Sequence, residues 1–400
     1  MPRRDASDAW ARHAGEWRDP AQVVAMWGGA SALDRRLLDA KADRGWWSLI
    51  EELGITLFVT REYEHLVIAM SARGGRPLVT FLPIPHPSGL VVDRARRVMH
   101  LASTRNPNQV VTLRIAQGAL KRGDVAPRRP DRVRIGSFVP VASAIYPGSL
   151  YIHDLALIGG KLHANAVGHN AVVALGEGGR FRRVWWPKCV ERGGRPAFDR
   201  NYIQLNSIAP GRTVRSSYYS ASSALIGRRR PGDLEYKVDR QGVVFSGATR
   251  EPICGGLTRP HSVRQWNGKV WVANSGYGEI GIVDANRFEP VQRFEGWTRG
   301  LCLVADVAFV ATSRVIPRYA RYAPGLDCTR SICGVHAVCT KTGRLLGSIT
   351  WPSGNQVFAM DWIADTASQG LVFNSAGRDL ADDTAFFYGF LTTPESEARR

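Results

Sequence analysis

Residues 261–284 read HSVRQWNGKVWVANSGYGEIGIVD, and this stretch decides the fold class. It holds three short apolar runs, and the first two are joined by Asn267-Gly268, a dipeptide typical of a two-residue β-hairpin turn. Valine, isoleucine and tryptophan recur in these runs, and such residues favour strands over helices. The stretch therefore predicts a small antiparallel sheet whose strands follow one another along the chain.

The same pattern recurs along the chain. A second clear copy, residues 153–175, reads HDLALIGGKLHANAVGHNAVVAL. With four weaker copies included, the repeats begin at Ser88, His153, Asn206, His261, Arg299 and Phe358. These starts lie roughly 54 residues apart on average, which suits a blade of four strands and one long loop. We therefore predict an all-β fold, a six-bladed β-propeller over residues 51–395.

The ends of the repeat region predict how the ring closes and what precedes it. A strand-like run begins at Ile55, before the first repeat, and we expect it to join the last blade, because this closure removes the free sheet edges. Seven blades are the alternative if one further weak repeat exists. Residues 1–50 lack the β pattern: Ser7 can cap a helix that carries Trp10 and Trp17 on one face. We expect a short α-helical N-terminal extension there.

The composition argues against several classes of function. The net charge is +18, but the 46 Arg far outnumber the 7 Lys and are spread along the chain, so we expect a solvated surface rather than a nucleic-acid footprint. No Gly-x-Gly-x-x-Gly fingerprint opens a βαβ unit and no P-loop is present, which argues against NAD and ATP as cofactors. The first residues form no apolar signal segment, and no run of about 18 apolar residues occurs. We therefore expect a cytoplasmic protein without a membrane span.

The residues at the repeat starts form the candidate functional site. In a propeller the first strand of each blade lines the central channel, so these residues converge near the axis. His153 and His261 are in register in two blades, and we predict that they act as catalytic general acid and base. Arg299 is the expected clamp for a carboxylate or phosphate, because a guanidinium offers two parallel hydrogen bonds to such groups. The alternative for each histidine is a structural role in which a backbone carbonyl satisfies the imidazole.

Further polar residues complete the predicted site. Besides Arg299, the expected substrate-binding residues are Asn206, Asn274, Asn165, Arg264 and Asp154. Asp154 alternatively bonds turn amides, and Asn274 alternatively forms an Asx-turn. A second ring, at the end of the following strand, is expected to hold Thr104, Asn165, Asn274, Ser313 and Asn374. If one divalent transition metal binds, its expected ligands are His153, His261 and Asn206, because a nitrogen and oxygen set suits such metals.

Several of these segments resemble a known family. The strings that carry the resemblance are Ile152-His153-Asp154-Leu155-Ala156, Leu205-Asn206-Ser207-Ile208-Ala209, Arg259-Pro260-His261-Ser262-Val263-Arg264, Asn274-Ser275-Gly276-Tyr277-Gly278-Glu279-Ile280-Gly281 and Arg299-Gly300-Leu301. In this order they resemble motifs of a poorly characterised bacterial family of propeller-like conserved hypothetical proteins, over residues 46–365. Gln204 departs from that family, which has a histidine there, so a metal site that uses this position is not implied. In its general pattern of short strand-like runs and turns, the chain is also similar to virginiamycin B lyase, gluconolactonase and strictosidine-synthase-type propellers. Those propellers place a metal or a polar cluster at the axis.

Together these observations predict an enzyme with a small-molecule site at the central mouth of the propeller. Its expected substrate is an anionic metabolite or peptide-derived molecule with a carboxylate or phosphate, and the expected chemistry is that of a lyase, hydrolase or isomerase. The alternative is a non-catalytic propeller that binds a protein partner through the N-terminal helices and rim loops such as residues 314–330.

Overall fold

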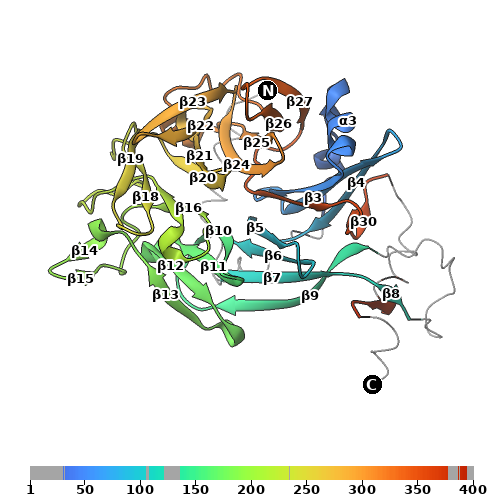
Figure 1. Cartoon of the computed structure of the whole chain (residues 1–400), viewed down its shortest axis with the longest axis horizontal. Coiled ribbons are helices and arrows are strands. Elements are labelled where there is room, and N and C mark those ends of the chain that lie inside the picture. The colour runs from blue at the N-terminus through green and yellow to red at the C-terminus, as the bar shows by residue number, and fades with distance from the viewer. Residues whose placement is uncertain are drawn as a thin grey trace.

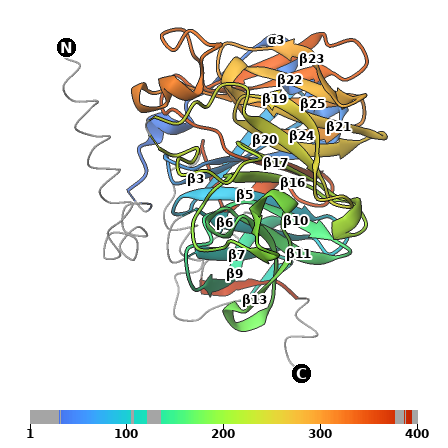
Figure 2. The ribbon, with the colours of Figure 1, turned by 90° about the vertical axis from the view of Figure 1, so that its left-hand side faces the viewer.

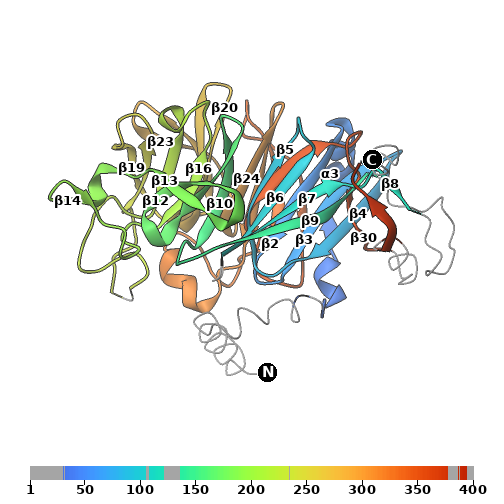
Figure 3. The ribbon, with the colours of Figure 1, turned by 90° about the horizontal axis from the view of Figure 1, so that it is seen from below.

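The computed structural model describes residues 30, 32–104, 108–120, 136–233, 235–376, 386 and 388–393. Within these residues, six sheets of four or five strands surround a common centre (Figure 1), which confirms the predicted six-bladed β-propeller. Edge-on views show that the innermost strands cross the disc from one face to the other (Figure 2 and Figure 3). The starts of these strands therefore gather at one end of the central channel, and their ends gather at the other.

Each blade is an antiparallel meander that runs from the centre outward. Blades 1 to 3 consist, in this order, of β5 (Pro87–Asp93), β6 (Val98–Ser103), β7 (Asn108–Ile115) and β9 (Ser137–Tyr146); β10 (Ile152–Ile158), β11 (Lys161–Ala166), β12 (Ala171–Leu175) and β13 (Phe181–Trp185); and β16 (Leu205–Ala209), β17 (Tyr218–Ala221), β18 (Gly242–Ser246) and β19 (Pro252–Leu257). Blades 4 to 6 consist of β20 (Pro260–Trp266), β21 (Lys269–Asn274), β22 (Glu279–Asp284) and β23 (Arg287–Arg293); β24 (Trp297–Val304), β25 (Val307–Ser313), β26 (Gly334–Cys339) and β27 (Leu345–Thr350); and β28 (Met360–Ala364), β2 (Ile55–Arg61), β3 (Leu66–Arg73) and β4 (Arg76–Pro83).

Shorter elements decorate the blades. The remaining strands are β1 (Lys41–Ala42) on β27, β29 (Gly370–Leu371) on β9, β30 (Phe373–Asn374) on β4, and the two-stranded pairs β14 (Glu191–Arg192) with β15 (Arg195–Pro196) and β8 (Gly118–Ala119) with β31 (Phe390–Leu391). The helices whose bounds lie within the described residues are α3 (Arg44–Glu52) and the 3-10 turns η1 (Arg35–Leu38), η3 (Val167–His169), η4 (Glu177–Gly179), η5 (Lys188–Val190), η6 (Val214–Ser216), η7 (Ser275–Tyr277) and η8 (Pro317–Tyr322).

Blade 6 closes the ring with strands from both ends of the propeller sequence. Its inner strand β28 pairs antiparallel with β2, in a register that runs from Ala364 opposite Ile55 to Met360 opposite Val59. This pairing confirms the predicted closure, in which the strand that begins at Ile55 joins the last blade. It gives β28 and β2, from opposite ends of the propeller sequence, a paired neighbour within one blade in place of a free edge.

The closure corrects the position that we expected for Asn374. That residue lies on β30 at the outer edge of blade 6, opposite Thr80 of β4. Because the second strand of this blade comes from the start of the propeller sequence, the second-ring position belongs to the end of β2. There the Thr60 amide donates to the Ala359 carbonyl at 2.9 Å and the Phe358 amide donates to the Thr60 carbonyl at 2.8 Å.

The repeat starts coincide with the inner strands. Five of the six predicted starts are the second or third residue of an inner strand, and Phe358 lies two residues before β28. Apolar side chains from adjacent blades fill the space between the sheets. For example, Trp185 of blade 2 stacks on Tyr219 of blade 3 at 3.9 Å between ring centroids, and burial of one such large side chain contributes about 1.5–3 kcal/mol.

The segment before Ile55 packs against the ring. The Asp43 carboxylate caps α3 by accepting from the Gly45 and Trp46 amides at 3.1 and 3.0 Å, and it also accepts from the Ser348 amide of β27 at 2.7 Å. Trp46 is fully buried. The predicted helix around Trp10 lies outside the described residues. No helix in the described part of the chain is long and apolar enough to cross a membrane.

Candidate functional site

The two predicted catalytic histidines meet at the end of the channel where the inner strands begin. The ring centroids of His153 and His261 lie 6.1 Å apart, and each ring meets Phe358 edge to face at 5.5 Å. The three side chains come from blades 2, 4 and 6, so the propeller brings together residues that are far apart in the sequence. The sequence prediction of a converging ring is consistent with this arrangement.

Arg299 of blade 5 completes this group. Its guanidinium carbon lies 3.9 Å from the centre of the Phe358 ring, and its Nη2 lies 3.4 Å from Nε2 of His261. Only 7% of the Arg299 surface is exposed, and its buried Nε has no acceptor among the described residues. Nε of Arg299 can therefore donate a hydrogen bond to a ligand.

Arg259 is a second buried cation at the same place, and the sequence reasoning did not select it. Its guanidinium donates to the side-chain oxygen of Gln204 and lies 4.4 Å from the ring centre of Tyr322. Burial lowers the pKa of Arg259 to about 10, so it stays protonated at neutral pH. Neither Arg259 nor Arg299 forms an ion pair within 4 Å in the described part of the chain, although the buried Glu62 carboxylate lies near enough to Arg299 to oppose the lowering of its pKa by burial. We call His153, His261, Arg259, Arg299 and Phe358 the axial cluster.

Burial and the two cations keep both imidazoles neutral. Burial, then the charges of Arg299 and Arg259, lower the pKa of His153 well below its ordinary value, and a hydrogen bond to Asn206 opposes this shift. Burial and Arg299 likewise hold the pKa of His261 well below its ordinary value. Both side chains are therefore proton acceptors, rather than cations, at neutral pH.

The hydrogen bonds assign the proton on His261. Arg299 can only donate, so Nε2 of His261 must be the acceptor at 3.4 Å. Nδ1 then carries the proton and donates to the Ser262 hydroxyl oxygen at 2.9 Å, which also accepts from the Gly300 amide at 2.8 Å. Nδ1 of His153 is buried and has no partner among the described residues. Each imidazole therefore has one nitrogen available to a ligand or held only by a weak bond.

Two tyrosines lie near Arg299 of the axial cluster. The hydroxyls of Tyr63 and Tyr319 are hydrogen-bonded to each other, and Tyr319 lies beside Trp297 at 5.3 Å between ring centroids. The space between them and Gln356 measures about 10 Å³, close to the least that holds one water molecule. Tyr319 belongs to η8, on the long loop between β25 and β26. This space is therefore too small for a metabolite in the described structure.

Asn206 touches the axial cluster, whereas Asn165 and Asn274 connect neighbouring strands and blades. Asn206 donates to the Ser222 hydroxyl at 3.0 Å and to the Pro260 carbonyl at 2.9 Å. Asn165 accepts from the His153 and Asp154 amides at 3.0 and 2.5 Å and donates to the Leu205 carbonyl at 2.8 Å. The Asn274 side chain accepts from the Thr258 amide at 2.7 Å and donates to Glu279 at 2.8 Å. The Asn165 side chain thus uses most of its hydrogen-bonding capacity on backbone groups, and few of its donors and acceptors remain for a substrate.

Asp154 and Arg264 pair with each other in the middle of the channel. Arg264 Nη1 donates to the Asp154 carboxylate at 2.9 Å and Nη2 donates at 3.3 Å. Asp154 also accepts from the Leu155 and Ile208 amides at 3.1 and 3.0 Å. Burial raises the pKa of Asp154 and Arg264 opposes this shift. The pair links blades 2, 3 and 4, which matches the alternative role of Asp154 as an acceptor of backbone amides.

A backbone feature precedes four inner strands and was missed in the sequence. The residues two positions before the repeat starts in blades 1 to 4 have positive φ angles, and they are His86 (43°), Tyr151 (51°), Gln204 (50°) and Arg259 (55°). None of them is glycine, and such conformations cost free energy and collect at functional sites. Position in the repeat was the signal that could have identified these four residues, because each lies two residues before a repeat start.

The surroundings of the histidines favour an anion over a metal ion. Among the described residues, no group of three His, Cys, Asp or Glu side chains lies close enough to hold a metal. The predicted ligands His153, His261 and Asn206 lie beside two guanidiniums, and the Asn206 amide nitrogen already donates twice. Because cations repel one another, this donor set fits a negatively charged ligand better than a divalent metal.

The comparisons with known proteins agree with the fold. A family described as a domain of unknown function, DUF4915, matches residues 44–371, and the chain belongs to this family. No functionally curated protein matches it in sequence. A chain of a nidogen/laminin complex is similar in structure, with a TM-score of 0.51 and 8% identity over 77% of this chain and 98% of that chain.

Propeller enzymes show a more distant structural likeness. A gluconolactonase from Xanthomonas campestris has a TM-score of 0.43 and 14% identity over 70% of this chain and 82% of its own. A streptogramin B lyase has a TM-score of 0.36 and 11% identity over 72% of each chain. This distant likeness concerns the fold alone, and it carries no activity over to this chain.

Proposed function

Because membership of a family of unknown function supplies no activity, we propose from the site itself that the axial cluster binds a small anionic molecule and acts on it as an enzyme. The substrate carries a carboxylate or phosphate, and the reaction is a proton-transfer reaction of the lyase, hydrolase or isomerase type. One observation carries the proposal: Arg259 and Arg299 are both buried, and neither is ion-paired within the described residues, beside two neutral imidazoles.

Buried charges are costly unless they are paired. A guanidinium removed from water loses its hydration, and only an opposite charge or a set of hydrogen bonds replaces it. An anion about 4 Å from one such cation gains about 4 kcal/mol at an effective dielectric constant near 20. The free Nε of Arg299 and the weak 3.4 Å contact of its Nη2 with His261 leave that guanidinium able to turn toward a ligand.

Anion binding would also activate the histidines. Burial, and after it the charges of Arg299 and Arg259, depress the pKa of both imidazoles. An anion bound to Arg299 cancels much of this charge, so the pKa of each histidine rises toward the range useful for general base catalysis. His261 would then accept a proton at Nε2. Nδ1 would be the nitrogen through which His153 exchanges a proton with the substrate. Because their centroids lie 6.1 Å apart, the two rings can address two atoms of one small substrate.

Thermal shift and calorimetry with the full chain test the binding step. The probes are inorganic phosphate, monocarboxylates and dicarboxylates, each compared with an uncharged amide or ester of similar shape. We expect at least one anion to raise the melting temperature, and Arg299→Ala to weaken its binding at least tenfold. Arg73→Ala, at an exposed arginine of β3, is the matched control and should leave binding unchanged. Equal binding to both variants would refute the proposed clamp.

Turnover tests the catalytic step. Any anion that binds is incubated with the protein, and its conversion is followed by mass spectrometry and proton NMR. We expect His153→Ala and His261→Ala each to lower the rate at least a hundredfold, because general acid–base groups commonly contribute about 10²–10⁴-fold. Unchanged melting temperatures would show that the fold is kept. Retained turnover in both variants would exclude the assigned roles.

A further inference from the structure

A cavity of the described structure lies at the other end of the channel. It measures about 240 Å³ and is lined by the inner strands of all six blades: β5, β10, β16, β20, β24 and β28. No member of the axial cluster lines it. Arg264, three residues after His261 along β20, lines this cavity, and its ion pair with Asp154 stands between the two ends of the channel. The cavity is therefore separate from the proposed anion site.

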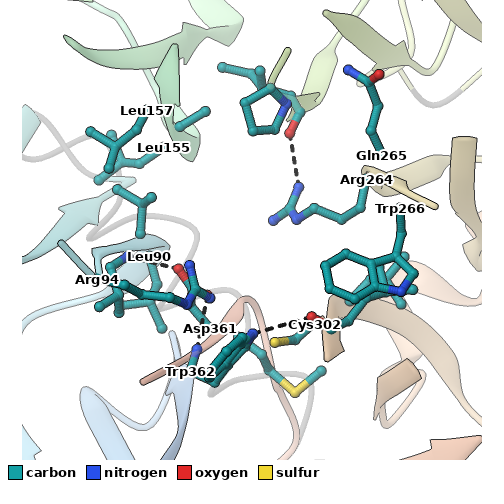
Figure 4. A pocket seen from close by; sticks show the side chains of 18 residues that line it. Leu90, Arg94, Leu155, Leu157, Arg264, Gln265, Trp266, Cys302, Asp361 and Trp362 are labelled. Carbon is teal, nitrogen blue, oxygen red and sulfur yellow. Dashed lines mark hydrogen bonds and ion pairs between the residues drawn. The ribbon is translucent and has the colours of Figure 1, made fainter. Parts of the chain in front are cut away.

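Two tryptophans give the cavity flat, fixed walls. Trp266 donates its indole N–H to the Ala305 carbonyl at 3.0 Å, and Trp362 donates to the Leu303 carbonyl at 3.2 Å. Because both indole donors are already used, the indoles offer only ring surface to a ligand. Figure 4 shows Trp266 to the right of the opening, Trp362 below it, and Leu155 with Leu157 at the upper left. Such walls fit a flat aromatic ring.

The charges that line the cavity are paired, in contrast to those of the axial cluster. Arg264 is held by Asp154 at 2.9 Å. Arg94 pairs with Asp361 and lies 4.3 Å above the ring of Trp362. Asp361 also accepts from the Val92 amide at 2.7 Å. An extra charge would enter this balanced and partly apolar space without a counter-charge, so an uncharged ligand is favoured.

One polar group remains available in the middle of the cavity. The guanidinium of Arg264 projects into the open space in Figure 4, and its side chain is 18% exposed. Its Nη1 makes three hydrogen bonds, whereas its Nε has no acceptor among the described residues. A ligand oxygen would therefore find a donor there, and a single directed hydrogen bond beside apolar walls is typical of small-molecule sites.

We propose that this cavity is a second ligand site, which takes a small uncharged aromatic molecule that carries one carbonyl or hydroxyl oxygen. The ring lies against Trp266 and Trp362, and the oxygen accepts from Arg264. The site differs from the axial cluster both in place and in ligand charge. It stands independently of the proposed enzymatic function, because none of its lining residues belongs to the acid–base group.

Benzamide and benzoate are suitable probes, because they share size and ring but differ in charge. Binding is measured by calorimetry and saturation-transfer NMR on the full chain. Benzoate is measured in an Arg299→Ala background, which removes its binding to the axial cluster. We expect benzamide to bind, Arg299→Ala to leave its affinity unchanged, and benzoate to bind at least tenfold more weakly.

A cavity-filling variant locates the site. Leu157→Trp should weaken benzamide binding at least tenfold, because Leu157 lines the cavity and is only partly buried. Leu157→Phe, a smaller step, should give an intermediate loss if the larger residue impairs folding. Leu225→Trp is the control at a leucine that is 68% exposed and outside the cavity, and it should bind like the parent chain. Absence of benzamide binding at millimolar concentration, equal affinity in both Leu157 variants and the parent, or stronger binding of benzoate would overturn the proposal.

Discussion

The buried Asp154–Arg264 pair makes a quantitative prediction about how the blades are joined. Asp154 has a side chain that is 3% exposed and accepts four hydrogen bonds, two from Arg264 and one each from the Leu155 and Ile208 amides. Asp154→Ala removes all four and leaves Arg264 as a cation without its partner. Loss of one partner of a buried ion pair commonly costs about 3–5 kcal/mol, and we expect a loss of that size in the free energy of unfolding.

A double-mutant cycle separates this pair from its surroundings. Alanine suits the backbone at position 154, since Ala359 occupies the equivalent position in blade 6. In Asp154→Ala/Arg264→Met the unpaired cation is also removed, so the double variant should be more stable than the sum of the single effects predicts. We expect a coupling free energy of about 2 kcal/mol.

Urea unfolding followed by tryptophan fluorescence measures each variant. The control is Asp306→Ala, which breaks an exposed ion pair with Lys341 and should cost less than about 1 kcal/mol. The reasoning fails if Asp154→Ala costs no more than this control, or if the two single effects add. In either case Asp154 and Arg264 would be free for the substrate-binding role that the sequence suggested.

Three further predictions concern packing, pH and the N-terminal segment. Gly89→Ala should lower the free energy of unfolding by about 1–3 kcal/mol, because its Cβ would lie 2.7–2.8 Å from the backbone of blade 2. Gly255→Ala is the control: its Cβ meets nothing nearer than 4.0 Å, so it should be nearly neutral in the same urea assay. Burial lowers the pKa of His336 from 6.5 to about 4, so the unfolded chain binds the proton first and stability falls as the pH drops below 6.5. By pH 4 this loss reaches about 3 kcal/mol, and His336→Gln should show a shallower pH dependence of unfolding; equal slopes would contradict the assignment. Asp43→Ala removes the cap of α3 and the hydrogen bond to β27, and it should lower the free energy of unfolding by about 1–2 kcal/mol in thermal unfolding. Asp39→Ala, at an exposed carboxylate, is the neutral control.

The blade pattern was readable from the sequence because it is local. Short β runs, turn dipeptides such as Asn267-Gly268 and a regular spacing are set by neighbouring residues, so they appear in the sequence without knowledge of the fold. The same spacing identified the inner-strand starts and hence the meeting of His153 and His261. Even the closure of the ring followed, because a strand that precedes the first repeat removes a free sheet edge by joining the last blade.

The chemistry of each polar side chain was not readable, because it depends on contacts between blades. Asn165 and Asp154 have the polar character of ligand-binding residues, yet both accept amides that the packing of the blades places beside them. Asn374 was misplaced because the closing blade takes its second strand from the other end of the propeller sequence. Residue type gives the capacity for a bond, and the neighbouring blade decides which bond forms.

The six-bladed ring, the residues that begin its inner strands and the pairing of its ends could all be predicted from the amino-acid sequence. Three features became visible only in the folded chain: Arg259 joins Arg299 as a second buried cation, Asp154 neutralises Arg264, and a separate cavity opens at the far end of the channel. The physical reason is the range of the interactions. Strand and turn preferences act over a few residues, whereas burial, ion pairing and pKa shifts arise from groups that lie scores of residues apart and meet only when the blades pack.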